Sequence, residues 1–219
     1  MELTPGFQSS NLGVAIIQGA CNPEAKGLVT DLGDSALHSL LDDGVGKEIP
    51  VLKSIIACRK TWAAIHDQLF LQKVLSFLQA CPKFTETERK KFLDKCLSAP
   101  KKTTQLSRAI VLILDKLDDL DKPKLLARAF AALVRDRIPL ETFRRLAAAI
   151  DIGFVEDLLA LQRTPRGKLD EPLLRSLLRT GFVEITQNTR RITRASQRRL
   201  WIVYRVSILG ATFVECLEE

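Results

Sequence analysis

Apolar residues recur at three- and four-residue steps along most of the chain from residue 28 onward, which is the period of amphipathic α-helices. One stripe covers residues 28–41 and ends at a glycine-containing segment. A longer stripe covers residues 49–80, beginning near Pro50 and ending before Pro82. We therefore predict a multi-helix bundle with short loops over residues 28–162.

Local signals mark further helices within this region. Residues 85–88 (Thr-Glu-Thr-Glu) match a capping box, in which a threonine and a glutamate satisfy each other's backbone donors at a helix start. Pro123 and Pro139 mark two more starts. The run at residues 109–114 is apolar on every side of a helix, so we predict a central buried helix over 106–117, with a strand as the alternative.

The first 27 residues show no such stripe, and polar residues interrupt the uncharged stretch between Leu3 and Pro23. No Lys or Arg precedes that stretch, so we expect no signal peptide there. We treat residues 1–27 as a separate N-terminal segment and leave its order open. Charged residues interrupt the stripe over 49–80, so we expect that it does not span a bilayer, although it has the pattern of a helix lying on a membrane surface.

The periodicity changes in the C-terminal part. A helix is predicted from Pro172 to Gly181, followed by strand-like alternation at residues 182–186 and 200–206 and a last helix capped by Ser207. Helix, strand, basic loop, strand and helix is the order of the second half of a winged-helix module. The predicted fold is all-α, a bundle with a small C-terminal winged-helix-like β-hairpin element, and residues 163–219 are assigned to that module.

Positive charge is concentrated in this module. The chain carries +7 in total, yet residues 1–162 hold 22 basic against 20 acidic residues, whereas residues 163–205 hold 11 basic against three. Arginines, interleaved with Thr, Ser and Gln, are the side chains that contact phosphates without reading sequence. The predicted binding residues for nucleic acid or an acidic partner are Arg175, Arg179, Arg190, Arg191, Arg194, Arg198 and Arg199.

Motifs for other chemistry are missing from the sequence. It has no nucleophile-elbow, Walker-type, Rossmann or His-Glu-x-x-His pattern, and adjacent His66 and Asp67 would point about 100° apart on a helix. The acidic cluster at residues 115–121 lacks the glycine of a calcium loop and is interpreted as helix ends. Five scattered cysteines without a Cys-x-x-Cys pair indicate reduced thiols in the cytoplasm. We expect no enzyme activity, cofactor, metal or small-molecule substrate.

Several segments resemble bacterial helical proteins of unassigned activity, namely residues 49–53, 67–78 and 114–126 (IPVLK, DQLFLQKVLSFL and LDKLDDLDKPKLL). Residues 178–183 and 208–213 (LRTGFV and ILGATF) are similar to the winged tail of abortive-infection alpha proteins. The resemblance covers most of residues 35–217 and implies a role in bacterial defence against phage. It carries over no catalytic residue, and the basic stretch at 187–199 is longer than the family pattern.

Three functional hypotheses follow from the sequence. The first is a non-enzymatic interaction or effector protein of the phage-defence type, which contacts a protein partner or a second copy through its helices and a polyanion or acidic protein through the basic loop. The second is a DNA-binding winged-helix regulator, whose duplex affinity would fall steeply with salt. The third is a membrane-surface effector that uses the helix at residues 49–80.

Overall fold

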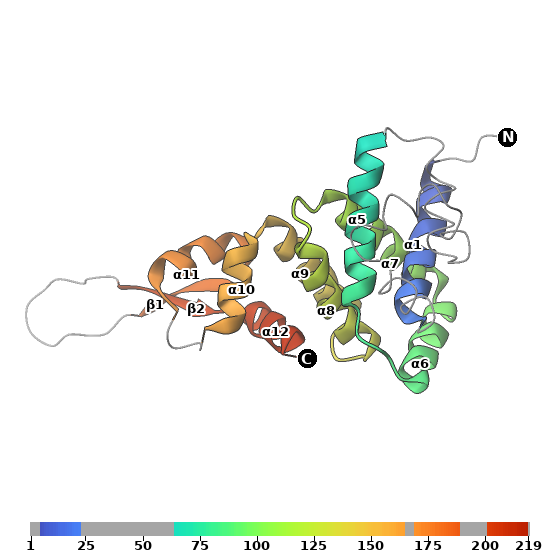
Figure 1. The fold of residues 1–219 in the computed structure, drawn as a ribbon. Helices are drawn as coiled ribbons and strands as arrows, with labels where there is room; N and C mark the ends of the chain where they lie inside the picture. Colours follow the sequence, from blue (N-terminus) through green and yellow to red (C-terminus); the bar gives the residue numbers. More distant parts are fainter. Residues whose placement is uncertain (1–4, 23–63, 165–168, 189–200, 219) are drawn as a thin grey trace, which may run out of the picture.

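A computed structural model describes residues 5–22, 64–164, 169–188 and 201–218 (Figure 1). Within these ranges the chain is helical apart from one antiparallel hairpin near the C-terminus, which confirms the predicted all-α fold with a hairpin element. The stripe expected at residues 28–41 lies outside the described residues, as does the first part of the stripe at 49–80.

The helices and strands follow the order α1, α5–α11, η3, β1, β2 and α12 (Figure 1). Their bounds are α1 (Pro5–Cys21), α5 (Ala64–Ala80), α6 (Glu86–Leu97), α7 (Pro100–Lys116), α8 (Lys122–Val134), α9 (Leu140–Ile152), α10 (Val155–Arg163), α11 (Glu171–Leu177), the 3₁₀ turn η3 (Leu178–Thr180), β1 (Val183–Asn188), β2 (Trp201–Val206) and α12 (Ile208–Leu217).

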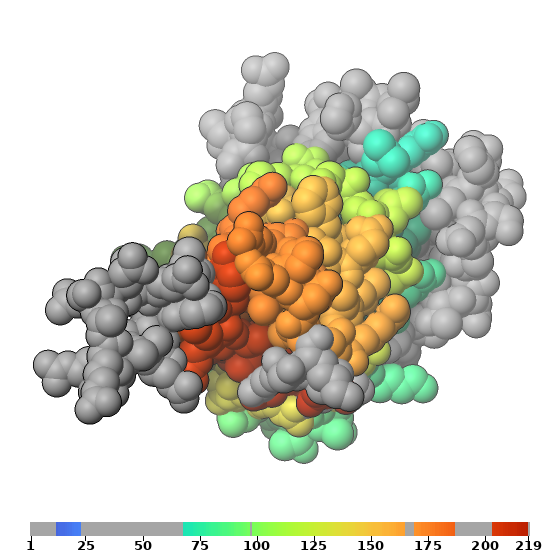
Figure 2. Space-filling view, turned by 90° about the vertical axis from the view of Figure 1, so that its left-hand side faces the viewer, coloured from blue at the N-terminus to red at the C-terminus, as the bar shows by residue number. Residues whose placement is uncertain are grey.

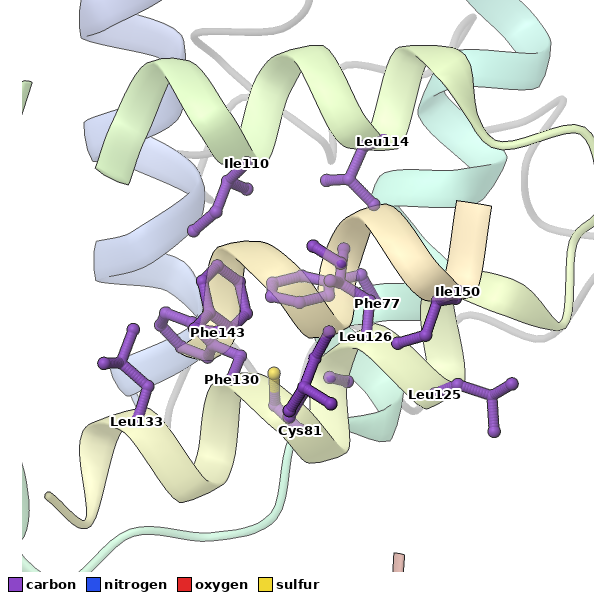
Figure 3. Packing of buried hydrophobic residues seen from close by; sticks show 14 of the residues in the cluster. Phe77, Cys81, Ile110, Leu114, Leu125, Leu126, Phe130, Leu133, Phe143 and Ile150 are labelled. Atoms are coloured by element: carbon purple, nitrogen blue, oxygen red, sulfur yellow. The ribbon is translucent and has the colours of Figure 1, made fainter. Parts of the chain in front are cut away.

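Helix α8 is the centre of the hydrophobic core. Every residue of α8 except Lys124 and Arg128 is buried, and the helix packs against α5, α6, α9 and α12. The Phe130 ring lies 5.5 Å from that of Phe77 and 6.1 Å from that of Phe143, which joins three helices in one aromatic cluster (Figure 3). Such ring pairs add to the free energy gained from burial alone.

The prediction that the helix at residues 106–117 is the central buried element is wrong. Helix α7 begins at Pro100 and buries one face, with Ile110 and Leu114 directed into the core (Figure 3), while the Leu112 side chain is 67% exposed. Six consecutive apolar residues cover all directions around a helix, so one side remains in solvent where no neighbour packs on it.

Helix α1 is an element that the sequence reasoning missed. Its residues Leu12, Ile16 and Ile17 are buried, and α1 packs along α7. The two helices approach closely at Gly13, where a Cβ atom would lie 2.2 Å from the backbone oxygen of Ser107. Residues 5–21 therefore belong to the helical bundle, although they were expected in a segment separate from it.

The start of α6 forms as predicted. The Thr85 side chain accepts a hydrogen bond from the Glu88 backbone N–H (3.2 Å), and the Glu88 carboxylate accepts one from the Thr85 backbone N–H (2.7 Å). The bond from the Thr85 backbone is the largest cause that lowers the pKa of Glu88, and a bond from the Thr85 hydroxyl to the same carboxylate (2.9 Å) and the nearby Arg135 lower it further. The reciprocal capping satisfies two donors that a helix start leaves unpaired.

None of the cysteines that the structure describes forms a disulfide bond. Cys21, Cys81 and Cys216 are buried and Cys96 is half-buried, whereas Cys58 lies outside the described residues. Burial raises the pKa of Cys21 to about 12 and that of Cys216 to about 11. In the described part of the chain, no helix combines the length and apolar character needed to cross a membrane.

Candidate nucleic-acid interface

Helix α11 forms the start of the candidate interface and is fixed at both ends by its own sequence. Asp170 caps it by accepting a hydrogen bond from the Leu173 N–H (3.3 Å), and Pro172 occupies the first turn. After the turn η3, Gly181 ends the helical segment with φ +76°, a conformation that side chains with a Cβ rarely adopt. The predicted helix and its glycine stop are confirmed.

A compact junction holds the base of the hairpin to α12. Ser207 donates from its backbone N–H to the Phe182 oxygen (2.9 Å) and from its hydroxyl to the Gly181 oxygen (2.6 Å). The same hydroxyl accepts from the Gly210 N–H (3.1 Å), which caps α12 as predicted. The Phe182 and Phe213 rings stack with centroids 4.5 Å apart. These contacts hold the base of the hairpin in a fixed position against α12.

The two strands pair in one antiparallel register, from Val183 opposite Val206 to Asn188 opposite Trp201. Because side chains alternate along a strand, Val183 and Tyr204 lie on the face that packs toward α11 and the core. Glu184 and Arg205 are opposite each other on the other face, and both are exposed. The hairpin thus has one face against the protein and one in solvent.

Arg175 lies beside the hairpin. Its guanidinium donates two hydrogen bonds to the Glu171 carboxylate, at 2.9 Å from Nε and 2.5 Å from Nη2, and lies 6.0 Å from the centre of the Tyr204 ring. The hydrogen bonds to Glu171 raise the pKa of Arg175, so the side chain stays charged. These two bonds use two of the five N–H donors of the guanidinium, and the side chain is exposed.

Arg179 has different neighbours from Arg175. Its guanidinium is 6.0 Å from the centre of the exposed Phe154 ring and donates to the backbone oxygen of Ile152 (3.4 Å), at the corner between α9 and α10. The two guanidinium groups therefore contact different aromatic rings. The sequence reasoning missed both ring partners, because which ring meets which arginine depends on the tertiary arrangement.

The other predicted binding residues, Arg190, Arg191, Arg194, Arg198 and Arg199, lie outside the described residues. The strand pairing still assigns all five to the twelve-residue connection between Asn188 and Trp201. By contrast, residues 169–188 and 201–218 together carry three arginines against five acidic residues. The positive charge of the module is thus confined to its connecting segments, not to the body of α11, β1, β2 and α12.

Helices α10 and α11 pack together with α11 exposed. Ser176 on α11 donates a hydrogen bond to the Asp157 carboxylate on α10. Figure 2 shows the resulting face, with α11 in orange between α10 and the red of the hairpin and α12. Helix α12 also packs on α8 and α9, so the buried cluster continues across the boundary predicted at residues 162 and 163.

The acidic residues between α7 and α8 are engaged by lysines. Lys122, which is buried, donates to the Asp118 carboxylate (2.5 Å) and to the backbone oxygen of Asp151 (2.6 Å), and Lys124 pairs with Asp121 (2.5 Å). The hydrogen bond from Lys122 is the main cause that lowers the pKa of Asp118. Lys122 also places positive charge at the C-terminus of α9, where the helix dipole favours it.

A metal site finds no support in the described part of the chain, where no three His, Cys, Asp or Glu side chains are grouped to hold an ion. His66 and Asp67 lie in α5.

Comparison of the chain with family models, curated proteins and solved structures finds no match in any of the three.

Proposed function

We propose that this chain is a non-catalytic interaction protein that binds a polyanion, with duplex nucleic acid as its partner, through the basic connection of its C-terminal hairpin. The observation that carries the proposal is the strand register. Because Asn188 pairs with Trp201, a twelve-residue segment with five arginines and no acidic residue joins the ends of β1 and β2. The Phe182–Ser207 junction anchors the other end of the hairpin on the bundle.

The chemistry of this connection favours phosphate over bases. Its arginines alternate with Thr189, Thr193, Ser196 and Gln197, which donate hydrogen bonds to phosphate oxygens. In α11 and η3, Arg175 pairs with Glu171 and Arg179 lies at the α9–α10 corner, so part of their hydrogen-bonding capacity is used within the protein. We therefore expect binding that depends on the charge of the backbone and little on its sequence.

The membrane-surface hypothesis is weakened by the position of α5. Leu71, Leu75 and Leu78 belong to the apolar stripe of residues 49–80, and in the structure they are buried, with α5 packed on α8. An apolar face that is part of the core is not available to lipid. The hypothesis would then depend on residues 49–63, which lie outside the described residues.

The direct test measures the anisotropy of a labelled DNA duplex at about 50 mM salt. One variant changes Arg190, Arg191, Arg194, Arg198 and Arg199 to Ala. A matched control removes five exposed basic residues of the bundle, Lys83, Lys90, Lys101, Lys102 and Arg108. We expect the control to keep most of the wild-type affinity and the five-arginine variant to lose it.

Two results would overturn this assignment. Failure of the wild type to bind duplex at this salt concentration excludes a nucleic-acid partner. Displacement of the duplex by poly-glutamate at an equal concentration of charge would instead favour an acidic protein as the partner. A role in phage defence, implied by the resemblance to abortive-infection alpha proteins, is tested separately by comparing phage plating on bacteria that express the wild type and the five-arginine variant.

A further inference from the structure

A shallow apolar groove lies between α7 and α9, away from the hairpin. It contains a cavity of about 190 Å³ with Phe143 and Ile113 among its lining residues. The volume is below the roughly 300–1,000 Å³ of small-molecule sites, so it fits an anchoring side chain better than a metabolite. The full lining is Ala109, Leu112, Ile113, Lys116, Phe143, Arg144, Ala147 and Ala148.

Leu112 stands at the edge of this groove with 67% of its side chain exposed. It belongs to the most apolar run of the sequence, residues 109–114. The alanines at 109, 147 and 148 are small, so they leave room for a partner to approach the backbones of both helices. An exposed leucine beside a recess of apolar side chains offers an apolar contact to a helix of another protein.

Three basic residues lie around the apolar centre, and the exposed Asp115 lies beside them on α7. Arg108 and Lys116 lie four residues before and after Leu112 on α7, which places them on the same helix face, and Arg144 lies across the groove on α9. All three side chains are exposed. Lys116 pairs with Asp151, whereas Arg108 and Arg144 have no ion-pair partner among the described residues. The lining of the groove includes no acidic residue.

We propose that this groove binds an amphipathic helix of a partner protein, one whose apolar stripe is flanked by acidic residues. The recess between two helices suits the ridge of a third helix, and the three basic residues complement the acidic flanks. A second copy of the same face does not fit, because it would bring the same positive charges together. This proposal does not depend on nucleic-acid binding by the hairpin, since the two surfaces share no residue.

The test uses two synthetic helical peptides whose binding is followed by fluorescence anisotropy. Both carry leucines at positions i, i+3/i+4 and i+7, with glutamate flanks in one peptide and lysine flanks in the other. Leu112→Ser removes the exposed anchor, and Arg108→Glu with Arg144→Glu reverses the charge of the rim. The matched control is Lys83→Glu with Lys90→Glu, which changes the net charge equally at exposed positions outside the groove.

We expect the wild type and the control to bind the glutamate peptide, and Leu112→Ser to weaken this binding about tenfold. The variant with Arg108→Glu and Arg144→Glu should bind the lysine peptide more tightly than the glutamate peptide. A misfolded variant would bind neither peptide. Equal affinity of the wild type for both peptides, or binding unchanged by Leu112→Ser, would overturn the proposal. Leu112-dependent binding to phosphatidylglycerol vesicles without binding to the glutamate peptide would also overturn it, in favour of a lipid surface.

Discussion

The guanidinium of Arg175 lies 6.0 Å from the centre of the Tyr204 ring, and this contact connects α11 to β2. Glu171, one turn earlier on α11, holds the same guanidinium by two hydrogen bonds. The arginine that the sequence suggests as a ligand contact therefore acts within the protein, where it orients the helix against the hairpin. Its cationic head and the face of the ring attract each other electrostatically.

Replacing Arg175 with Ala should loosen the hairpin. We expect hydrogen exchange of the β2 amides at residues 201–206 to become a few-fold faster, because the contact between helix and strand is lost. Arg145→Ala is the matched control, since Arg145 makes the same kind of ion pair one turn apart, with Glu141 at 2.8 Å. Equal exchange at β2 in both variants would show that the ring contact does not stabilise the hairpin.

Gly210 is required by the close approach of α12 to the hairpin base. A Cβ atom at this position would lie 2.2 Å from the Phe182 backbone oxygen, which itself accepts the Ser207 N–H. Gly210→Ala should lower the free energy of unfolding in urea by up to about 2 kcal/mol. Overpacking costs about 1–3 kcal/mol, and the higher helix propensity of alanine offsets about 1 kcal/mol of this cost. Ile208→Ala, at an 88% exposed position of α12, should change it by less than about 0.5 kcal/mol.

The capping box at α6 should make stability depend on acid pH. The pKa of Glu88 is lower in the folded chain than the usual glutamate value, mainly because of the hydrogen bond from the Thr85 backbone. Its contribution is therefore complete above the unfolded-state pKa of about 4.3 and is lost as the pH falls through the lower folded value.

Glu88→Gln, measured by urea unfolding from pH 7 to pH 3, should lose less stability on acidification than the wild type. Thr85→Ala should cost about 1 kcal/mol at pH 7. An identical loss of stability in the wild type and Glu88→Gln across this pH range would show that Glu88 does not contribute in this way.

The buried cysteines should be unreactive in the folded protein. The pKa of Cys21 is raised to about 12 and that of Cys216 to about 11, both mainly by burial, so neither carries much thiolate at pH 8. Peptide mapping after iodoacetamide treatment should find both unmodified without denaturant and both modified in concentrated urea. Rapid labelling of either residue in the native protein would contradict this description of the core.

Much of the fold could be predicted from local signals. The capping box at Thr85, the glycine stop at Gly181 and the cap at Ser207 depend on residues within a few positions of one another, and all three are present in the structure. Their physical basis is the need to satisfy backbone donors at helix ends, which does not depend on the rest of the fold.

The burial of whole helices could not be predicted in the same way. The run at residues 109–114 is more apolar than α8, yet α8 is the more buried helix because it has neighbours on nearly all sides. Helix α1 escaped prediction although Leu12, Ile16 and Ala20 follow a helical period, because Gly13 and several polar residues obscure that stripe. The structure shows why glycine is needed at position 13, because α1 approaches the Ser107 backbone too closely there for a Cβ atom.

The candidate interface was predicted in part. The strand pairing and the helix that precedes it follow from the alternation of apolar residues and the turn signals. The partners of Arg175 and Arg179 do not, because Tyr204 and Phe154 are distant in sequence from the arginines they meet. The expected contact with a polyanion therefore rests on the connection between Asn188 and Trp201, where five of the seven predicted arginines lie.

The salt dependence of duplex binding tests this central claim most directly. If the five arginines of the connection each neutralise one phosphate, a plot of log Kobs against log salt should have a slope of about −4.5 for the wild type, at about −0.9 for each phosphate contact. The variant with all five changed to Ala should show a slope near zero. Equal slopes for the wild type and this variant would contradict the account, because duplex binding would then involve other cations of the chain.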